Sequence, residues 1–308
     1  MPRHGPLQIL KWKLGMSRRE APAVPDAPDT PAAWMAVEES RLEAPPMSTW
    51  QLTWLGHASW LLQLGGANLL IDPVFSEYCA PVRIPSLRRQ QGPGVLPGGL
   101  PGIDGVLLTH SHYDHLDLPT LRNLPGNPPL VVPEGHREWL RGKGFGDVTE
   151  LAWGDSCALG RGLTVHATPA QHFTARTPFD RDRGHWCGWV VEGGGMRIYF
   201  AGDTGYAPLF GDIARRHAAL DLAVLPIGAY APRWLMRPIH LDPEEAVRAH
   251  LELGPRCSVA SHWGTFRLTD EALGEPPIWL ARACDAAGVA RKDFRVLKVG
   301  ETLSGEEV

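Results

Sequence analysis

The sequence predicts a layered α/β protein in which short apolar strands alternate with a few helices. Roughly a dozen segments have the length and β-branched or aromatic composition of strands, and helical segments lie between several of them. Polar residues of the types used in catalysis and ligand binding come directly after several of these strands. Because sites in open α/β sheets form beyond the carboxyl ends of the strands, we expect a functional site at one sheet edge.

Composition narrows the class of protein further. The chain has 308 residues, of which 21% are charged and 44% are hydrophobic, as in ordinary globular proteins. A net charge of −4 provides no basic surface for nucleic acid. Five scattered cysteines form no CxxC pair, which argues against a disulfide framework or a cysteine zinc knuckle. No apolar run approaches the ~20 residues of a membrane span, so we expect a cytoplasmic protein.

The chain divides into an expected N-terminal arm, residues 1–47, and one main domain, residues 48–308. The arm is rich in Pro, Ala and Asp, and we expect one short helix around Trp34–Leu42. Within LQILKWKLGM (7–16), apolar residues alternate with lysines. This segment is either an interfacial amphipathic element or part of an arm packed on the domain.

The domain begins with short strands between residues 50 and 74, separated by turns at Gly56 and at Gly65–Gly66. Residues 79–104 hold many Pro and Gly residues and predict a functional lid or binding loop. Later strands are expected at 105–109, 130–133, 163–170, 185–193, 196–203, 221–229, 256–263 and 294–300. Helices are expected from Pro119, through Trp139, at 241–255 and at 277–287.

The helix at 241–255 has the clearest boundaries. Asp242 is the expected N-cap, Pro243 the first helical residue and Glu245 the third, while Gly254-Pro255 ends the helix.

The stretch THSHYDHLD, at the end of the strand expected at 105–109, contains several residues that can bind metal ions. His110 and His112 are two residues apart in near-extended chain and point the same way, so both can bind one ion. The bend turns Asp114 and His115 differently, toward a second ion. Neutral imidazoles and carboxylates suit zinc, whereas magnesium and calcium require more oxygen ligands.

Three further candidate ligands each follow an apolar strand: His172, Asp203 and His262. Seven such groups are too many for one tetrahedral ion and suit two. Two neighbouring cations need an anionic bridge, for which Asp203 is the candidate. Iron or manganese remain alternatives to zinc, and a coincidental polar loop is the alternative to a metal site.

These motifs resemble the metallo-β-lactamase superfamily. WLGHAS, DPVFS, HYDHLD, FAGDTGY, PIGAYAPRW, HLDPEEA and HWGTF resemble, in order, the N-acylphosphatidylethanolamine-hydrolysing phospholipase D family. The resemblance implies an αββα sandwich, with two mixed β-sheets face to face, helices on the outer faces, and two zinc ions per chain. It assigns His110, His112 and His172 to the first zinc, Asp114, His115 and His262 to the second, and Asp203 to the bridge.

The same blocks suggest roles around the metals. Asp72 matches an aspartate under the site that orients a ligand imidazole, with a plain turn residue as the alternative. His57 is expected to support the site or to pack beside it. His240 is a candidate for contact with the substrate phosphate or leaving group, with a structural role as the alternative. Tyr206, Tyr230 and Trp234 are candidates for substrate binding or for the core.

The function that the resemblance implies is zinc-dependent hydrolysis of N-acylphosphatidylethanolamine-like phosphodiesters through a metal-bridging hydroxide, with Asp114 or Asp203 accepting a proton. The alternatives are a zinc lactonase or other carbonyl hydrolase, and a non-catalytic metal-binding module. We expect a phospholipid or small phosphodiester substrate and no nucleic-acid partner. A homodimer and peripheral contact with the inner membrane face are further expectations from the resemblance.

Overall fold

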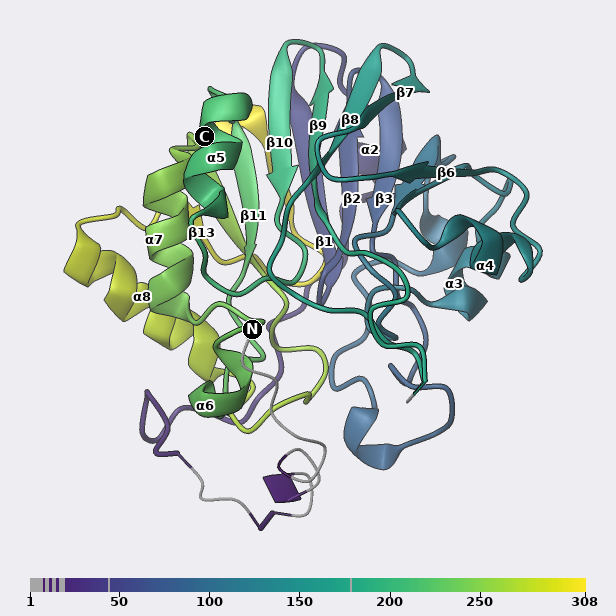
Figure 1. The fold of residues 1–308 in the computed structure, drawn as a ribbon. Helices are drawn as coiled ribbons and strands as arrows, with labels where there is room; N and C mark the ends of the chain where they lie inside the picture. Colours follow the sequence, from purple (N-terminus) through teal and green to yellow (C-terminus); the bar gives the residue numbers. More distant parts are fainter. Residues whose placement is uncertain (1–7, 9–10, 13–14, 17–19, 44, 178) are drawn as a thin grey trace.

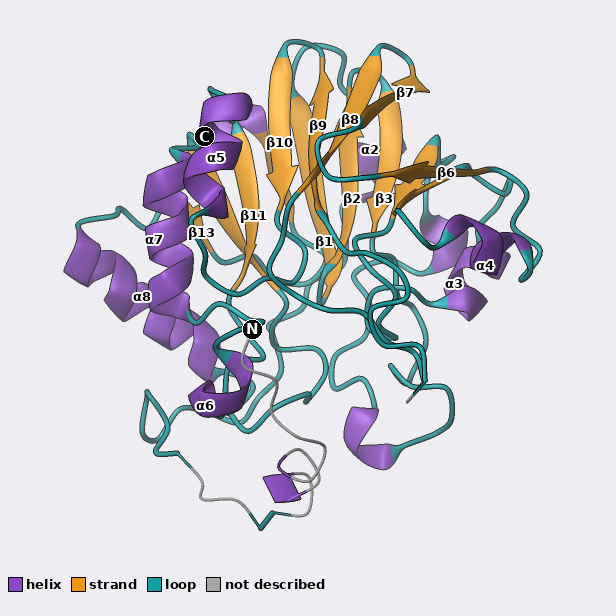
Figure 2. Cartoon of the chain, viewed as in Figure 1, coloured by secondary structure: helices purple, strands orange, loops and turns teal. Residues whose placement is uncertain are grey.

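Two seven-stranded sheets pack face to face, with helices on their outer sides (Figure 1). The computed structural model describes residues 8, 11–12, 15–16, 20–43, 45–177 and 179–308. Figure 2 shows the strands gathered in the centre, with one group of helices on each flank and long loops at one end of the strands. The predicted αββα sandwich is confirmed.

Both sheets are mixed. The first has the order β14 (Thr302–Ser304), β1 (Trp50–Gly56), β2 (Ser59–Leu64), β3 (Ala67–Ile71), β4 (Gly105–Leu107), β5 (Leu130–Pro133) and β6 (Val148–Leu151). The second has the order β13 (Phe294–Arg295), β12 (Cys257–Ser261), β11 (Leu222–Pro226), β10 (Met196–Phe200), β9 (Gly188–Gly193), β8 (Leu163–Thr168) and β7 (Ser156–Gly160). Strands β3 to β6 run parallel, as do β10 to β13, so their carboxyl ends face one edge.

The helices are α2 (Glu39–Glu43), α3 (Leu118–Asn123), α4 (Arg137–Arg141), α5 (Leu209–Arg216), α6 (Arg233–Met236), α7 (Pro243–Leu253) and α8 (Glu275–Ala287). In Figure 1, α5, α7 and α8 flank the second sheet, and α3 and α4 lie on the opposite side of the molecule.

The central strands of the first sheet, β2 to β5, are buried along their whole length, which places them inside the sandwich. On β2, Trp60 and Leu62 point into the core between the sheets, whereas Leu61 packs into a second core with Leu121 of α3 and Leu140 of α4. Successive side chains of a strand point to opposite faces, so a continuously apolar strand requires a covering layer on each side.

The structure corrects two expected elements. The helix expected around Trp34–Leu42 is wrong at its start, because only Glu39–Glu43 is helical. The strand expected at 294–300 ends at Arg295. The first correction has a visible cause, since Trp34 forms a parallel bridge with Val299 and is therefore extended. Strands β6, β7 and β14 and helices α5 and α6 were not predicted.

The arm packs on the domain where the structure describes it. The backbone N–H of Ala23 donates to Glu275 Oε1 at 2.9 Å, and that of Leu273 donates to Asp29 Oδ1 at 3.1 Å. Half of the segment 7–16, namely residues 7, 9–10 and 13–14, lies outside the described residues. Within the described part of the chain, no helix is long and apolar enough to cross a membrane.

The expected loop 79–104 contains two short 3-10 helices, Pro85–Leu87 and Pro97–Gly99. The backbone N–H of Gln90 donates to Thr265 O at 2.8 Å, and the Arg89 guanidinium lies over the Phe266 ring at 4.9 Å. The loop is therefore tied to the segment that follows His262. All five cysteines are free thiols, four of them buried and Cys157 half-buried.

Helix α7 has the predicted boundaries, and its N-terminus is a capping box. Asp242 Oδ1 accepts from the Glu245 backbone N–H at 2.8 Å, and Gly254 ends the helix in the left-handed conformation. We expect Asp242→Ala to lower the free energy of unfolding by about 1 kcal/mol, because the Glu245 N–H loses its acceptor. Urea unfolding measures this change, with Glu244→Ala on the same turn as the control, and equal stabilities for the two variants would contradict it.

Candidate metal centre

The predicted ligands come together because each follows the carboxyl end of a strand. Asp72 follows β3, His110 to His115 follow β4, and Asp203 and His262 follow β10 and β12. His172 follows β8, an antiparallel strand of the second sheet. The seven expected ligands are thus drawn from both sheets to one edge of the sandwich.

Three imidazoles form the first donor group. His110 Nε2 lies 2.8 Å from His112 Nδ1, and His172 Nε2 lies 3.2 Å from the same His112 atom. His110 and His172 are buried, with side chains 1% exposed. The structure therefore brings His110, His112 and His172 together, and their binding to one ion stays a prediction.

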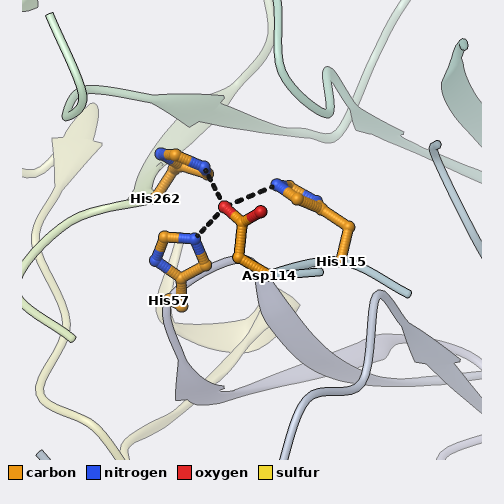
Figure 3. A group of neighbouring side chains, drawn as sticks. All are labelled: His57, Asp114, His115 and His262. Atoms are coloured by element: carbon orange, nitrogen blue, oxygen red, sulfur yellow. Dashed lines mark hydrogen bonds and ion pairs between the residues drawn. The ribbon is translucent and has the colours of Figure 1, made fainter. Parts of the chain in front are cut away.

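The second donor group surrounds Asp114 (Figure 3). Its Oδ2 atom lies 3.3 Å from His262 Nε2, 3.5 Å from His115 Nε2 and 2.9 Å from His57 Nε2. His57 therefore contacts Asp114 directly, in keeping with a supporting role. The backbone N–H of His57 donates to Thr265 Oγ1 at 2.8 Å, which positions the ring.

Asp203 lies between the two groups. Its Oδ2 is 3.7 Å from His172 Nε2 in the first group and 3.2 Å from His115 Nε2 in the second, while its Oδ1 is 3.1 Å from His262 Nε2. The preceding Gly202 has φ +61°, and a Cβ there would lie 3.0 Å from the Thr109 Cβ. Glycine is required at that position on both grounds.

The buried Asp72 carboxylate stabilises the turn that contains His110 to His115. Asp72 Oδ2 accepts from His115 Nδ1 at 2.7 Å and from the Thr109 hydroxyl at 2.6 Å. The Thr109 oxygen lies 3.0 Å from His110 Nδ1, so one aspartate orients a histidine of each donor group. Such contacts leave Nε2 of both rings toward the metal position. Thr109 is not among the residues predicted from the sequence, although its place directly before His110 is a usable signal.

Three residues of this site have a strained backbone. His57, Asp72 and His262 have φ values of 54°, 44° and 59°, in the left-handed region that residues with a side chain seldom occupy. Strained positions of this kind persist where the surrounding structure overdetermines them, and they cluster at functional sites.

Burial and mutual contact set the charges in the metal-free site. Burial lowers the pKa of His172 to about 3 and that of His112 to about 4, which keeps both imidazoles neutral. Burial opposes ionisation of Asp203, but His115 and His262 overcome it and hold its pKa well below the ordinary value. His112 and His172 are thus neutral and Asp203 is ionised, which are the forms of these side chains that bind zinc.

The donor atoms fit metal ions. Among the described residues, His115 Nε2, His262 Nε2 and Asp203 Oδ1 are buried atoms without a hydrogen-bond partner. A cation between them would satisfy all three. Tetrahedral zinc with bonds of about 2.0–2.1 Å separates its ligand atoms by about 3.3 Å, close to the contacts of Asp203 and Asp114 described above.

His240 also faces this cluster. One of its ring nitrogens lies within 4.8 Å of the donor atoms of Asp203 and His262, and its side chain is buried. Its Nδ1 has no hydrogen-bond partner among the residues described, and burial lowers its pKa to about 3. A neutral imidazole with an unused nitrogen suits contact with a substrate oxygen.

The three aromatic candidates make packing contacts. The Tyr206 hydroxyl contacts Glu252, and the Arg248 guanidinium lies 4.1 Å from its ring centre. Tyr230 is buried with its ring 5.0 Å from that of Trp279. The Trp234 backbone N–H donates to Glu20 Oε1 at 3.3 Å. Substrate binding by these residues stays a prediction.

The metal-free protein should lose stability at alkaline pH. Burial disfavours charge on His262, but Asp203 and Asp114 overcome it and raise its pKa from 6.5 to about 9. A raised pKa stabilises the fold fully below pH 6.5, and this contribution disappears as the pH rises through 9. We expect the free energy of unfolding to fall by roughly 2–3 kcal/mol between pH 7 and 10.

Urea unfolding of the chelator-treated protein at several pH values measures this effect, with His262→Asn as the control whose profile should be flatter. A flat profile for the unsubstituted protein would show that the pair of carboxylates does not hold a proton on His262.

Comparison with known proteins agrees with this geometry. The family model described as Beta-lactamase superfamily domain matches residues 67–263. N-acyl-phosphatidylethanolamine-hydrolyzing phospholipase D 1 of Caenorhabditis elegans is 37% identical over 247 residues, 76% of this chain and 69% of its own. A UPF0173 metal-dependent hydrolase of Aeropyrum pernix is 31% identical over 270 residues, 82% of this chain and 96% of its own.

Among solved structures, an isothiocyanate hydrolase from Delia radicum gut bacteria superposes with a TM-score of 0.67 at 26% identity, covering 82% of this chain and 98% of its own. The fold and the clustered His and Asp donors define a metal-dependent hydrolase of the metallo-β-lactamase fold. Within that superfamily, the chain belongs to the family resembling the N-acylphosphatidylethanolamine-hydrolysing phospholipases D.

Proposed function

We propose that this chain is a dinuclear zinc phosphodiesterase that hydrolyses N-acylphosphatidylethanolamine-like phospholipids or related diesters. The observation that carries the proposal is the position of Asp203, whose two oxygens reach histidines of both donor groups. Membership of the phospholipase family supports the substrate class.

Each group of the site has a role in this reaction. Zinc ions bound at the two donor groups would supply a water of lowered pKa and neutralise charge on the phosphate. Hydrolysis forms a bond from the water oxygen to phosphorus and breaks the phosphorus bond to the ethanolamine oxygen, which takes up a proton. Asp114 Oδ2, in contact with three imidazoles, is placed to accept the proton of the water. The neutral His240 donates a hydrogen bond to a substrate oxygen.

A substrate panel tests the proposal. Metal-loaded protein is assayed on N-acylphosphatidylethanolamine in mixed micelles, on bis(p-nitrophenyl) phosphate and on a set of lactones, with metal content measured for each preparation. We expect turnover of a phosphodiester to exceed that of every lactone. Faster lactone turnover would instead favour the carbonyl hydrolase, and loaded protein without turnover of any substrate would refute an enzyme of either kind.

His240→Gln separates substrate contact from metal binding. We expect turnover of the phosphodiester to fall about 100-fold, because the flexible glutamine amide does not hold its donor where the rigid imidazole does, while metal content stays the same. His185→Gln, an exposed histidine, is the matched control. Loss of metal in His240→Gln would make His240 a ligand and contradict the assigned role.

A further inference from the structure

A second group of metal-ligand side chains lies outside the catalytic centre. His166, Glu192 and His217 offer ligand atoms that all lie within 4.8 Å of one another. We call these three residues the outer-face cluster. From their geometry, we propose that the outer-face cluster binds a zinc ion that ties the end of helix α5 to strands β8 and β9.

The sheet brings the first two residues together. Thr164 on β8 pairs with Glu192 on β9, and His166 lies two residues beyond Thr164 on the same face. His166 and Glu192 are both partly exposed, with side chains 23% and 31% accessible. Their neighbours Val165 and Val191 are completely buried in the core, so the alternation of the strands places the polar pair opposite the core.

Helix α5 supplies the third residue. His217 is its C-cap, and its ring meets that of His166 edge-on with centres 5.0 Å apart. The Glu192 carboxylate lies between the rings, with Oε2 3.6 Å from His166 Nε2 and Oε1 3.7 Å from His217 Nδ1. These separations are close to the ~3.3 Å expected between ligands of tetrahedral zinc.

One nitrogen atom of the cluster is available to bind an ion. His166 Nε2 is buried and, among the described residues, has no hydrogen-bond partner. Glu192 Oε1 already accepts from Arg197 Nε at 2.9 Å, which leaves Oε2 toward His166. His217 also lines an open hollow of about 540 Å³, which places one member of the cluster beside solvent.

Two imidazoles and one carboxylate form a donor set that zinc accepts, and oxygen-preferring calcium or magnesium would be disfavoured. The site uses none of the seven expected ligands of the catalytic centre. Its occupancy is therefore independent of the proposed phosphodiesterase activity.

The test compares zinc content in a zinc-buffered solution at low-micromolar free zinc. We expect the unsubstituted protein to retain one more zinc per chain than His166→Gln or Glu192→Gln, whatever the total. His185→Gln, an exposed histidine beside Glu134, is the matched control and should keep the full content. Zinc should also raise the midpoint of thermal unfolding more in the unsubstituted protein than in His166→Gln.

A crystal of the unsubstituted protein measured at the zinc absorption edge locates the ion without any substitution. A peak between His166, Glu192 and His217 is the expected result. Equal zinc content in all variants, together with no anomalous peak at the cluster, would overturn the proposal.

Discussion

Replacing Asp203 with asparagine is expected to lower phosphodiesterase turnover by about 1,000-fold or more. The carboxylate oxygens of Asp203 reach histidines of both donor groups. An asparagine keeps the shape but removes the negative charge, and its NH₂ group cannot bind a cation. The two donor groups then lose the anion that offsets repulsion between neighbouring metal ions.

Turnover on the best diester and metal content by elemental analysis check this expectation together. Asp212→Asn, an exposed carboxylate on α5 nearby in the sequence, is the control and should leave both unchanged. Full activity and full metal content in Asp203→Asn would rule out the bridging role.

The second large effect is expected at Asp72, which touches no ion in the proposed site. Asp72 accepts three hydrogen bonds, from the Thr109 backbone, the Thr109 hydroxyl and His115 Nδ1. In Asp72→Asn one acceptor becomes a donor that faces another donor, so His115 and His110 lose their fixed orientation. We expect metal affinity to fall 10- to 100-fold, as for other residues that orient metal ligands.

Competition with a chromogenic chelator measures this affinity. Asp117→Asn is a matched control, because Asp117 is also a buried aspartate and accepts hydrogen bonds only from Ser76 N and Thr120 Oγ1 among the described residues. We expect that control to change the free energy of unfolding without changing metal affinity. Equal chelator competition by both variants would show that Asp72 is a turn residue and nothing more.

The sequence predicted the fold class because hydrophobic periodicity is a local property. Strands such as β5 and β11, which are apolar throughout, indicate two covering layers without knowledge of their partners. Helix α7 was predicted with its boundaries because the capping box and the terminal glycine lie within the helix itself. The same reasoning failed at Trp34, where an extended pairing with the distant Val299 overrides the local preference for a helix.

The residues of the metal centre also differ in how far the sequence alone predicts their arrangement. His110, His112, Asp114 and His115 share one turn, so spacing alone indicates two half-sites. His172, Asp203 and His262 were identifiable because ligand-type residues directly follow strands, although the distances between them belong to the sheet topology.

The sequence by itself determined the layered α/β class, the ligand types and the division of the histidine turn between two donor groups, and the resemblance of its motifs to a known superfamily added the sandwich. Only the tertiary structure decided that Thr109 links Asp72 to His110, that His57 contacts Asp114, and that His166, Glu192 and His217 converge. The physical reason is that these contacts join residues from separate strands and helices. Their distances depend on sheet register and helix packing, which a linear pattern of residue types does not encode.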